Sequence, residues 1–507
     1  MCKVFEPNFT KVVSSVRKNI GITQSVIELK LPTNENDINK IYSVGAKSTL
    51  TSFEPVGREL TFFGVVDFQA VYEKDGVLSL DYCAEFKDKF VAEEDIDGEV
   101  IVSSNVVDVN SSIVAGGIRV VAVVEVVVDV IESKDINVLS VVDCEGVHLS
   151  TEEITYSTYL GRAYEKFDVS EEIRIDQATN ILMVTPSVCL TRVDPRENYI
   201  VVSGKINLDI CYQEGVEFKD ISTMNKELDF VWEVAFSGVE EDSIVQSLVG
   251  VVTNEIKITT TIEDGSAIMG VYIPVVYSGY VYKETKMQVI DDLYVEKNYL
   301  SVTCENFYSI CSNNTITFKD NIGGTASVLD TSPFIDEVLG VCANNLILAG
   351  CKVVDEVLSV EGVANTTVIY YTKETNEITS VLVEMPFVVE QKVEGKDANI
   401  VSICLTNLSA KSKRGKEIEV SAEINIYADL YDAQKECVIS NVVIGEEKPI
   451  EDCALSIYIA KPNQTIWDIA KETSTSQELI LDQNPNIVLP IKAGDKLVIY
   501  KPAVVEF

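Results

Sequence analysis

The first residues to weigh are those that could act as catalysts, and the chain offers few. His148 is the only histidine among 507 residues, and it lies in the run Glu145-Gly146-Val147-His148-Leu149. A nucleophilic serine or cysteine needs a base, usually histidine, and no G-x-S-x-G motif is present. We therefore expect His148 to be a surface or edge-strand residue. The chain also has neither a Walker A loop nor a G-x-G-x-x-G motif, so we expect no bound nucleotide.

Metal-binding patterns are equally weak. The acidic run Glu93-Glu94-Asp95-Ile96-Asp97-Gly98 resembles a calcium loop only faintly, because it starts with Glu and places Ser104 where a bidentate Glu belongs. We interpret this run as a solvated turn. The twelve cysteines are scattered without a C-x-x-C pair, which argues against zinc and predicts reduced, mostly buried thiols. The sequence thus predicts a protein that is not an enzyme and has no cofactor or metal.

Charge restricts the kinds of partner. The net charge is -39, from 80 acidic and 41 basic residues, so nucleic acid and anionic membranes would repel the chain. The N-terminus lacks a basic start followed by an apolar run, and the most apolar stretch, Val120 to Ile131, is interrupted by Glu125 and Asp129. We interpret that stretch as a buried strand. These patterns predict a cytosolic protein that does not insert into membranes.

A long repeat indicates how the chain is organised. Gly64, Gly204 and Gly362 are each followed by Tyr after eight residues, and by F-V-x-E after 26, 26 and 25 residues. The repeat period of 140 and then 158 residues suits whole domains. In the structural interpretation, Phe90, Phe230 and Phe387 fill equivalent cores while the glutamates face outward. In the functional one, Glu93, Glu233 and Glu390 contact a partner.

The segments within each repeat are rich in Val and Ile, with partial alternation and polar turns, so we predict a mainly β protein. Three homologous domains, each a sandwich or barrel, would be followed by a small βααβ domain. Exposed strand edges would permit self-association. The predicted boundaries are an N-terminal arm at 1–24, repeats at 25–149, 150–318 and 332–444, a linker at 445–454 and the tail domain at 455–502.

The tail has its own local pattern. Ile457 to Ile459 and Leu497 to Tyr500 are short apolar strands. Thr465 can cap a helix with the apolar face Ile466, Ile469 and Ala470, and Thr475 with Glu478 forms the pattern of a capping box for a second helix. Pro485 should end that second helix. The order β-α-α-β follows.

This tail resembles a LysM module. The matching positions are Tyr458, Lys461, Thr465, Ile466, Trp467, Ile469-Ala470-Lys471, Leu479, Asn484-Pro485 and Gly494 to Ile499. Such modules usually bind N-acetylglucosamine polymers and occasionally bind protein. The candidate glycan loop is Asn463, Gln464 and Thr465, where sugar-binding members usually carry Gly-Asp before the Thr. The resemblance therefore implies protein binding more strongly than glycan binding, which we expect to be weak or absent.

The triplicated Gly…Tyr…F-V-x-E pattern with a terminal LysM module resembles the spore coat morphogenetic proteins of clostridial spore formers, which carry three SPOCS-type domains. The resemblance implies a non-enzymatic scaffold in the mother-cell cytosol, at the forespore surface. It also implies binding to the coat-basement ATPase of stage IV sporulation and to other coat proteins. The alternatives are a peptidoglycan- or chitin-binding protein of the cell envelope and a carbohydrate-active enzyme with a LysM tail.

The candidate partner surface centres on the first helix of the tail. Trp467 is either a core residue or an exposed anchor, and Trp is favoured at interface hot spots because it buries a large area. Lys471 adds a cation to an acidic chain. The predicted partner-binding residues are Ile466, Trp467, Lys471, Asn484, Pro485 and Asn486.

Overall fold

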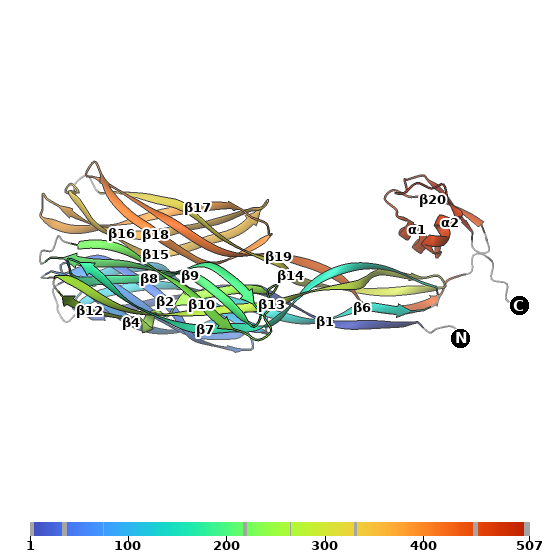
Figure 1. The fold of residues 1–507 in the computed structure, drawn as a ribbon, viewed down its shortest axis with the longest axis horizontal. Helices are drawn as coiled ribbons and strands as arrows, with labels where there is room; N and C mark the ends of the chain where they lie inside the picture. The colour runs from blue at the N-terminus through green and yellow to red at the C-terminus, as the bar shows by residue number, and fades with distance from the viewer. Residues whose placement is uncertain are drawn as a thin grey trace.

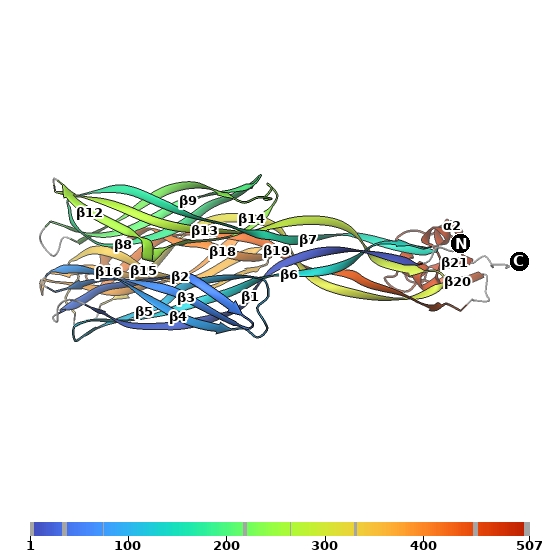
Figure 2. The same ribbon diagram turned by 90° about the horizontal axis from the view of Figure 1, so that it is seen from below.

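The computed structural model describes residues 5–32, 38–74, 76–144, 146–215, 221–263, 265–328, 332–449 and 455–500. The described chain is mainly antiparallel β-structure, as predicted, and its two α-helices lie in the tail. Strand pairing and shared hydrophobic cores group the strands before the tail into three units, each made of two sheets packed against each other. Figures 1 and 2 show these units side by side in a body, from which a stalk leads to the tail module.

The units share one strand order. Unit 1 pairs its strands as β1-β6-β5 and β2-β3-β4; its bounds are β1 (Glu6–Pro32), β2 (Lys40–Val56), β3 (Glu59–Glu73), β4 (Val77–Val91), β5 (Glu99–Val114) and β6 (Gly117–Asp143). Unit 3 pairs β14-β19-β18 and β15-β16-β17; its bounds are β14 (Asn298–Ser327), β15 (Glu337–Val354), β16 (Val357–Thr372), β17 (Glu377–Lys392), β18 (Asp397–Lys413) and β19 (Glu417–Glu447).

Unit 2 differs in one strand. One sheet has the order β10-β9-β8. In the other sheet, β13 pairs with β7 and also with β11 and β12. A 3-10 turn separates β11 from β12. The bounds of unit 2 are β7 (Val147–Asp176), β8 (Ala178–Arg196), β9 (Tyr199–Glu214), β10 (Ile221–Ala235), β11 (Ile244–Val251), η1 (Thr253–Glu255), β12 (Lys257–Glu263) and β13 (Ser266–Val295). Strands β11 and β12 together therefore occupy the place of β5 and β18.

The stalk consists of the long first and last strands of each unit. Each pair, β1 with β6, β7 with β13 and β14 with β19, runs beyond the body as a two-stranded ribbon. An isolated ribbon is marginal in water, so the three ribbons bury a shared core. At the tip, each contributes two apolar side chains: Leu139 and Val142, Ile290 and Leu293, Ile439 and Val442.

Several sequence predictions are confirmed or corrected by this pairing. The stretch from Val120 to Ile131 lies in β6 with every second residue buried, so it is a buried strand as predicted. The expected N-terminal arm at 1–24 is wrong for residues 6–24, which belong to β1 and pair with β6. The boundary expected between the second and third repeats, at residues 319–331, is wrong for residues 319–327, because they belong to β14. The expected linker from residue 445 begins within β19, and residues 450–454 lie outside the described part.

The repeated glycines are explained by cross-strand phenylalanines. Gly204 lies opposite Phe230, and Gly362 lies opposite Phe387. Gly64, however, lies opposite Phe86 and not Phe90, because the turn between β3 and β4 is shorter than its counterparts. The equal spacing to Phe90 was therefore a misleading coincidence. Phe90 instead packs over Gly21 of the facing sheet.

The glutamates of the same motif face away from these cores. Glu93, Glu233 and Glu390 are all exposed, in agreement with the structural interpretation of F-V-x-E. The acidic run from Glu93 to Gly98 forms bends after β4. Among the described residues, no cluster of three or more His, Cys, Asp or Glu side chains could hold a metal ion.

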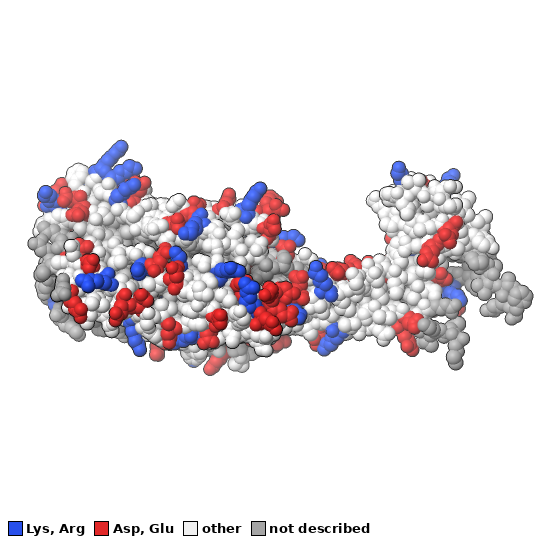
Figure 3. Space-filling model, viewed as in Figure 1, with Lys and Arg blue, Asp and Glu red and all other residues white. Residues whose placement is uncertain are grey.

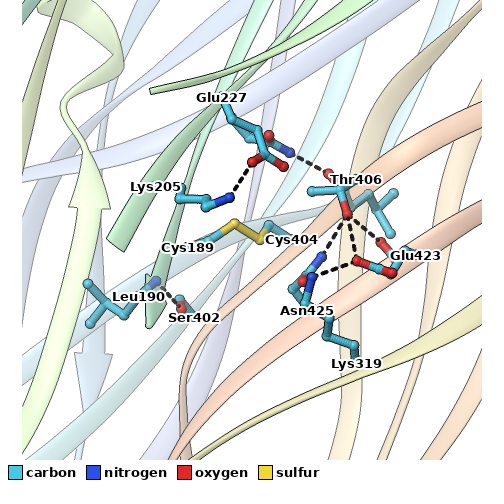
Figure 4. The surroundings of a disulfide bond; sticks show 12 residues. Cys189, Leu190, Lys205, Glu227, Lys319, Ser402, Cys404, Thr406, Glu423 and Asn425 are labelled. Carbon is cyan, nitrogen blue, oxygen red and sulfur yellow. Dashed lines mark hydrogen bonds and ion pairs between the residues drawn. A yellow bond between two sulfur atoms is a disulfide. The ribbon is translucent and has the colours of Figure 1, made fainter. Parts of the chain in front are cut away.

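A disulfide joins two units. Cys189 on β8 is bonded to Cys404 on β18, with Cα atoms 6.1 Å apart, which corrects the prediction of reduced thiols at these positions (Figure 4). Beside it, the Leu190 amide donates to Ser402 Oγ at 2.9 Å. Of the free cysteines in the described chain, Cys211 and Cys342 are buried, while Cys83, Cys304 and Cys437 are exposed.

A buried carboxyl group also lies between units 2 and 3. Asp429 on β19 accepts a hydrogen bond from the Ser247 amide on β11 at 2.9 Å, and its Oδ1 has no hydrogen-bond partner among the described residues. Burial raises the pKa of Asp429 to about 7, although the Ser247 hydrogen bond and Arg17 act in the opposite direction.

Replacing Asp429 with asparagine should therefore stabilise the protein at alkaline pH. Between the ordinary pKa of 3.8 and about 7, the folded carboxyl holds a proton that the unfolded chain has released, so the free energy of unfolding falls as pH rises. Asp429→Asn should remove this loss, a gain of about 4 kcal/mol at pH 8 that shrinks to about 2 kcal/mol at pH 5. Melting temperatures at both pH values test this, with exposed Glu390→Gln as the control. An equal effect at both pH values would contradict it.

Candidate functional site

The tail module has the predicted βααβ order: β20 (Leu455–Ile459), α1 (Ile466–Thr473), α2 (Gln477–Gln483) and β21 (Lys496–Tyr500). Thr465 caps α1 as predicted, and it forms a capping box with Asp468. The predicted capping box of Thr475 and Glu478 is wrong, because Ser476 caps α2 by accepting from the Leu479 amide. Thr475 instead donates its hydroxyl to the Thr473 carbonyl. The module core is formed by Ala460, Ile466, Ile469, Ala470, Ile480, Leu497 and Ile499.

The predicted partner-binding residues of α1 lie in different environments. Ile466 is buried in the module core. Trp467 and Lys471, one helical turn apart, both reach Asp292 at the stalk tip of unit 2. Trp467 Nε1 donates to Asp292 Oδ2 at 2.8 Å, and Lys471 Nζ donates to Asp292 Oδ1 at 2.5 Å. Trp467 therefore contacts the chain's own stalk and is only partly buried.

Tyr294, also from β13, completes this contact. Its ring meets the Trp467 ring edge-on, with centroids 5.1 Å apart, and its hydroxyl donates to the Thr475 carbonyl at 2.7 Å. The His148 ring stacks on the Tyr294 ring, with centroids 4.8 Å apart, and its Nε2 is 2.9 Å from Glu296 Oε1. The single histidine thus supports a packing contact on a strand, in line with its predicted structural role.

The electrostatics favour the ionised form of Asp292. Burial on its own would raise the pKa of this carboxyl, but hydrogen bonds from Lys471 and Trp467 lower it below its ordinary value. Burial also raises the pKa of Tyr294 to about 12, so its hydroxyl stays protonated and can donate. The contact therefore joins a carboxylate to two donors on α1.

The other predicted partner residues form the turn after α2. The Asn484 side chain donates to the carbonyls of Ile480 and Val498 and accepts from the Val498 amide, each at 2.8 Å. Asn484 thus fastens α2 to β21. Pro485 and Asn486 are exposed.

Two residues of the candidate glycan loop use their polar groups within the module. Asn463 has a φ of 63°, in the left-handed region that asparagine tolerates. The Gln464 amide contacts the Tyr458 hydroxyl, the Lys461 amide and Glu472. Thr465 is occupied as a cap, so Gln464 and Thr465 use their polar groups within the module, whereas Asn463 is exposed.

One feature that sequence reasoning missed is an apolar outer face on the module sheet. Leu455 pairs with Tyr500 and Ile457 pairs with Val498, on the face opposite the buried Leu497 and Ile499. These four side chains and Ile459 are 41–67 % exposed. The alternating apolar residues of β20 could have indicated this face, since both helices cover only one side of the sheet. Asp292, in contrast, had no local signal.

Charge is unevenly distributed between the module and the remainder. Residues 455–500 carry four lysines and five carboxylates, although the whole chain has a net charge of -39. Figure 3 shows charged side chains of both signs over the body and acidic ones gathered where the stalk begins. No helix among the described residues is long and apolar enough to cross a membrane.

Comparison with known proteins identifies two parts of the chain. A family model described as SipL, SPOCS domain, matches residues 177–266, which span β8 to β12 of unit 2. A LysM domain model matches residues 458–499, the tail module. Neither the curated proteins nor the solved structures contain a match. Both matched domains are of binding type and not catalytic, and together they fit a SipL-like, sporulation-related binding protein.

Proposed function

We propose that this chain is a non-enzymatic spore coat morphogenetic scaffold of the clostridial type, with units 1 to 3 as three SPOCS-type domains. It would act at the forespore surface in the mother-cell cytoplasm. Its LysM module and SPOCS-type units would dock onto the coat-basement ATPase and support assembly of other coat proteins. The observation that carries this proposal is the presence of a SipL SPOCS match and a LysM match in one chain.

The arrangement of the chain supports a docking role. The module lies at the far end of the stalk from the body, so one chain offers two separated binding regions (Figure 1). The module also carries an exposed apolar sheet face, and contiguous exposed apolar surface is typical of protein interaction sites. Its near-balanced charge suits contact with another protein better than the acidic body does.

Binding of the purified full chain to the purified coat-basement ATPase, measured by isothermal titration calorimetry, tests the proposal. We expect saturable binding that weakens at least tenfold when the chain ends at Pro449 and lacks the module. A truncated chain that binds as tightly as the full chain would contradict docking through the module. Failure of the full chain to bind would reject the ATPase as the partner.

The alternative is a LysM protein of the cell envelope that binds peptidoglycan or chitin oligomers. The left-handed backbone and exposed side chain of Asn463 favour it, because they leave this position of the loop open to a ligand. The internal hydrogen bonds of Gln464 oppose it. We expect chitopentaose to bind the full chain more weakly than about 100 µM, and tighter binding in the same calorimeter would favour the alternative.

A further inference from the structure

The α1 face of the module has the chemistry of a carboxylate-binding site. Two donors four residues apart, Trp467 Nε1 and Lys471 Nζ, converge on the two oxygens of a single carboxylate, that of Asp292. Residues at this spacing project from the same side of a helix. Beside these donors, the Thr475 carbonyl accepts a hydrogen bond from the hydroxyl of Tyr294. Tyr294 follows Asp292 by two residues on β13. The face thus accommodates a strand that presents a carboxylate and, two residues later, an aromatic hydroxyl.

Only one of the three ribbons carries this pair. The shared core of the stalk tip aligns Ile290 and Leu293 with Leu139 and Val142, and with Ile439 and Val442. The positions of Asp292 and Tyr294 are therefore filled by Val141 and Asp143 in β6, and by Asn441 and Val443 in β19. The module is joined in sequence to β19 of unit 3, yet it docks on β13 of unit 2. Side-chain recognition, and not mere proximity along the chain, explains its position.

The contact that holds the module against the stalk is small and partly open to water. The Lys471 and Asp292 side chains remain 45 % and 32 % exposed, and partly exposed ion pairs contribute little to stability. A second link comes from Lys448, which donates to Ser474 Oγ at 2.7 Å and to the Val295 carbonyl at 2.8 Å. The module is therefore held to the stalk by a few hydrogen bonds around the contact between the Tyr294 and Trp467 rings.

We propose that the α1 face is a docking surface for a protein strand or loop that bears a carboxylate and, two residues later, an aromatic hydroxyl, and that Asp292 and Tyr294 fill it in cis. A partner of that chemistry must displace them, so the free chain is self-inhibited. This inference rests on the proposed function, in which the module docks onto a protein partner. The surface formed by Trp467 and Lys471 would thus bind either the chain's own Asp292 and Tyr294 or the equivalent groups of a partner.

The first test measures whether Asp292 holds the module. In the full chain with Trp232→Phe, Trp467 is the sole tryptophan, and acrylamide quenching reports its exposure. We compare Asp292→Ala with Asp291→Ala, which removes the adjacent exposed carboxylate. Quenching of Trp467 should increase in Asp292→Ala and stay unchanged in Asp291→Ala. Unchanged quenching in Asp292→Ala overturns the inference.

The second test measures competition, with the purified coat-basement ATPase as the probe. If the contact is closed about nine-tenths of the time, opening it should tighten the apparent affinity about tenfold in Asp292→Ala and not in Asp291→Ala. Equal affinity of wild type and Asp292→Ala, with the module released, overturns self-inhibition while leaving the proposed function intact. If the wild type, Asp292→Ala and Asp291→Ala all fail to bind the ATPase, this protein is rejected as the partner that displaces Asp292. The quenching experiment still shows whether Asp292 holds the module against the stalk.

Discussion

Replacing Gly362 with alanine should destabilise unit 3 by about 3 kcal/mol, the upper end of the range for overpacking in a well-packed core. A Cβ atom at Gly362 would lie 2.3 Å from the Ile347 carbonyl oxygen and 2.5 Å from the Phe387 ring. The ring could rotate away, but the carbonyl belongs to the neighbouring strand and is fixed by pairing in the sheet. The added methyl group must therefore separate β15 from β16 or force Phe387 out of the core.

The matched control is Gly350→Ala on β15, where a Cβ atom would meet no atom within 4 Å. Native-state hydrogen exchange of β15 to β17 is the appropriate measurement, because a chain of several units need not unfold in two states. Protection in these strands should fall in Gly362→Ala and persist in Gly350→Ala. Equal protection in both variants would show that the cross-strand phenylalanine does not require glycine.

Replacing Trp467 with alanine should weaken binding to the coat-basement ATPase by roughly 2 kcal/mol or more, as expected at an interface hot spot. Trp467 supplies both an indole N–H and a large apolar ring at the α1 face, and only part of that ring is covered by Tyr294. Calorimetric affinity and a melting curve should be measured together. The conservative Trp467→Phe variant keeps the ring and removes the N–H, so it separates contact area from carboxylate recognition.

The possible results distinguish the roles of this residue. Lost binding with an unchanged melting temperature supports an interface role for Trp467. Parallel loss of binding and of melting temperature would make Trp467 a packing residue of the module. Unchanged binding by a folded variant would contradict the prediction and direct attention to the turn at Asn484, Pro485 and Asn486, or to the apolar sheet face around Ile457.

Features that depend on residues close together in the chain could be predicted from the sequence. The module elements, the Thr465 cap and the buried face of Ile466, Ile469 and Ala470 follow from spacings of a few residues. The β-rich character likewise follows from alternating Val and Ile, as in β6. The lack of catalytic motifs in the sequence favours a binding role, and the residue types of α1 indicate a candidate binding surface.

Contacts between residues far apart in the chain are visible only in the folded protein. A shorter turn shifted Phe86, and not Phe90, opposite Gly64, because register depends on turn length and on the partner strand. Residues 6–24 lacked any repeat pattern yet pair with β6 across more than 100 residues of sequence. Asp292 is one of many carboxylates in an acidic chain, and its role arises only because the ribbon tip brings it to Trp467 and Lys471. Such contacts join segments far apart in sequence, so no local pattern encodes them.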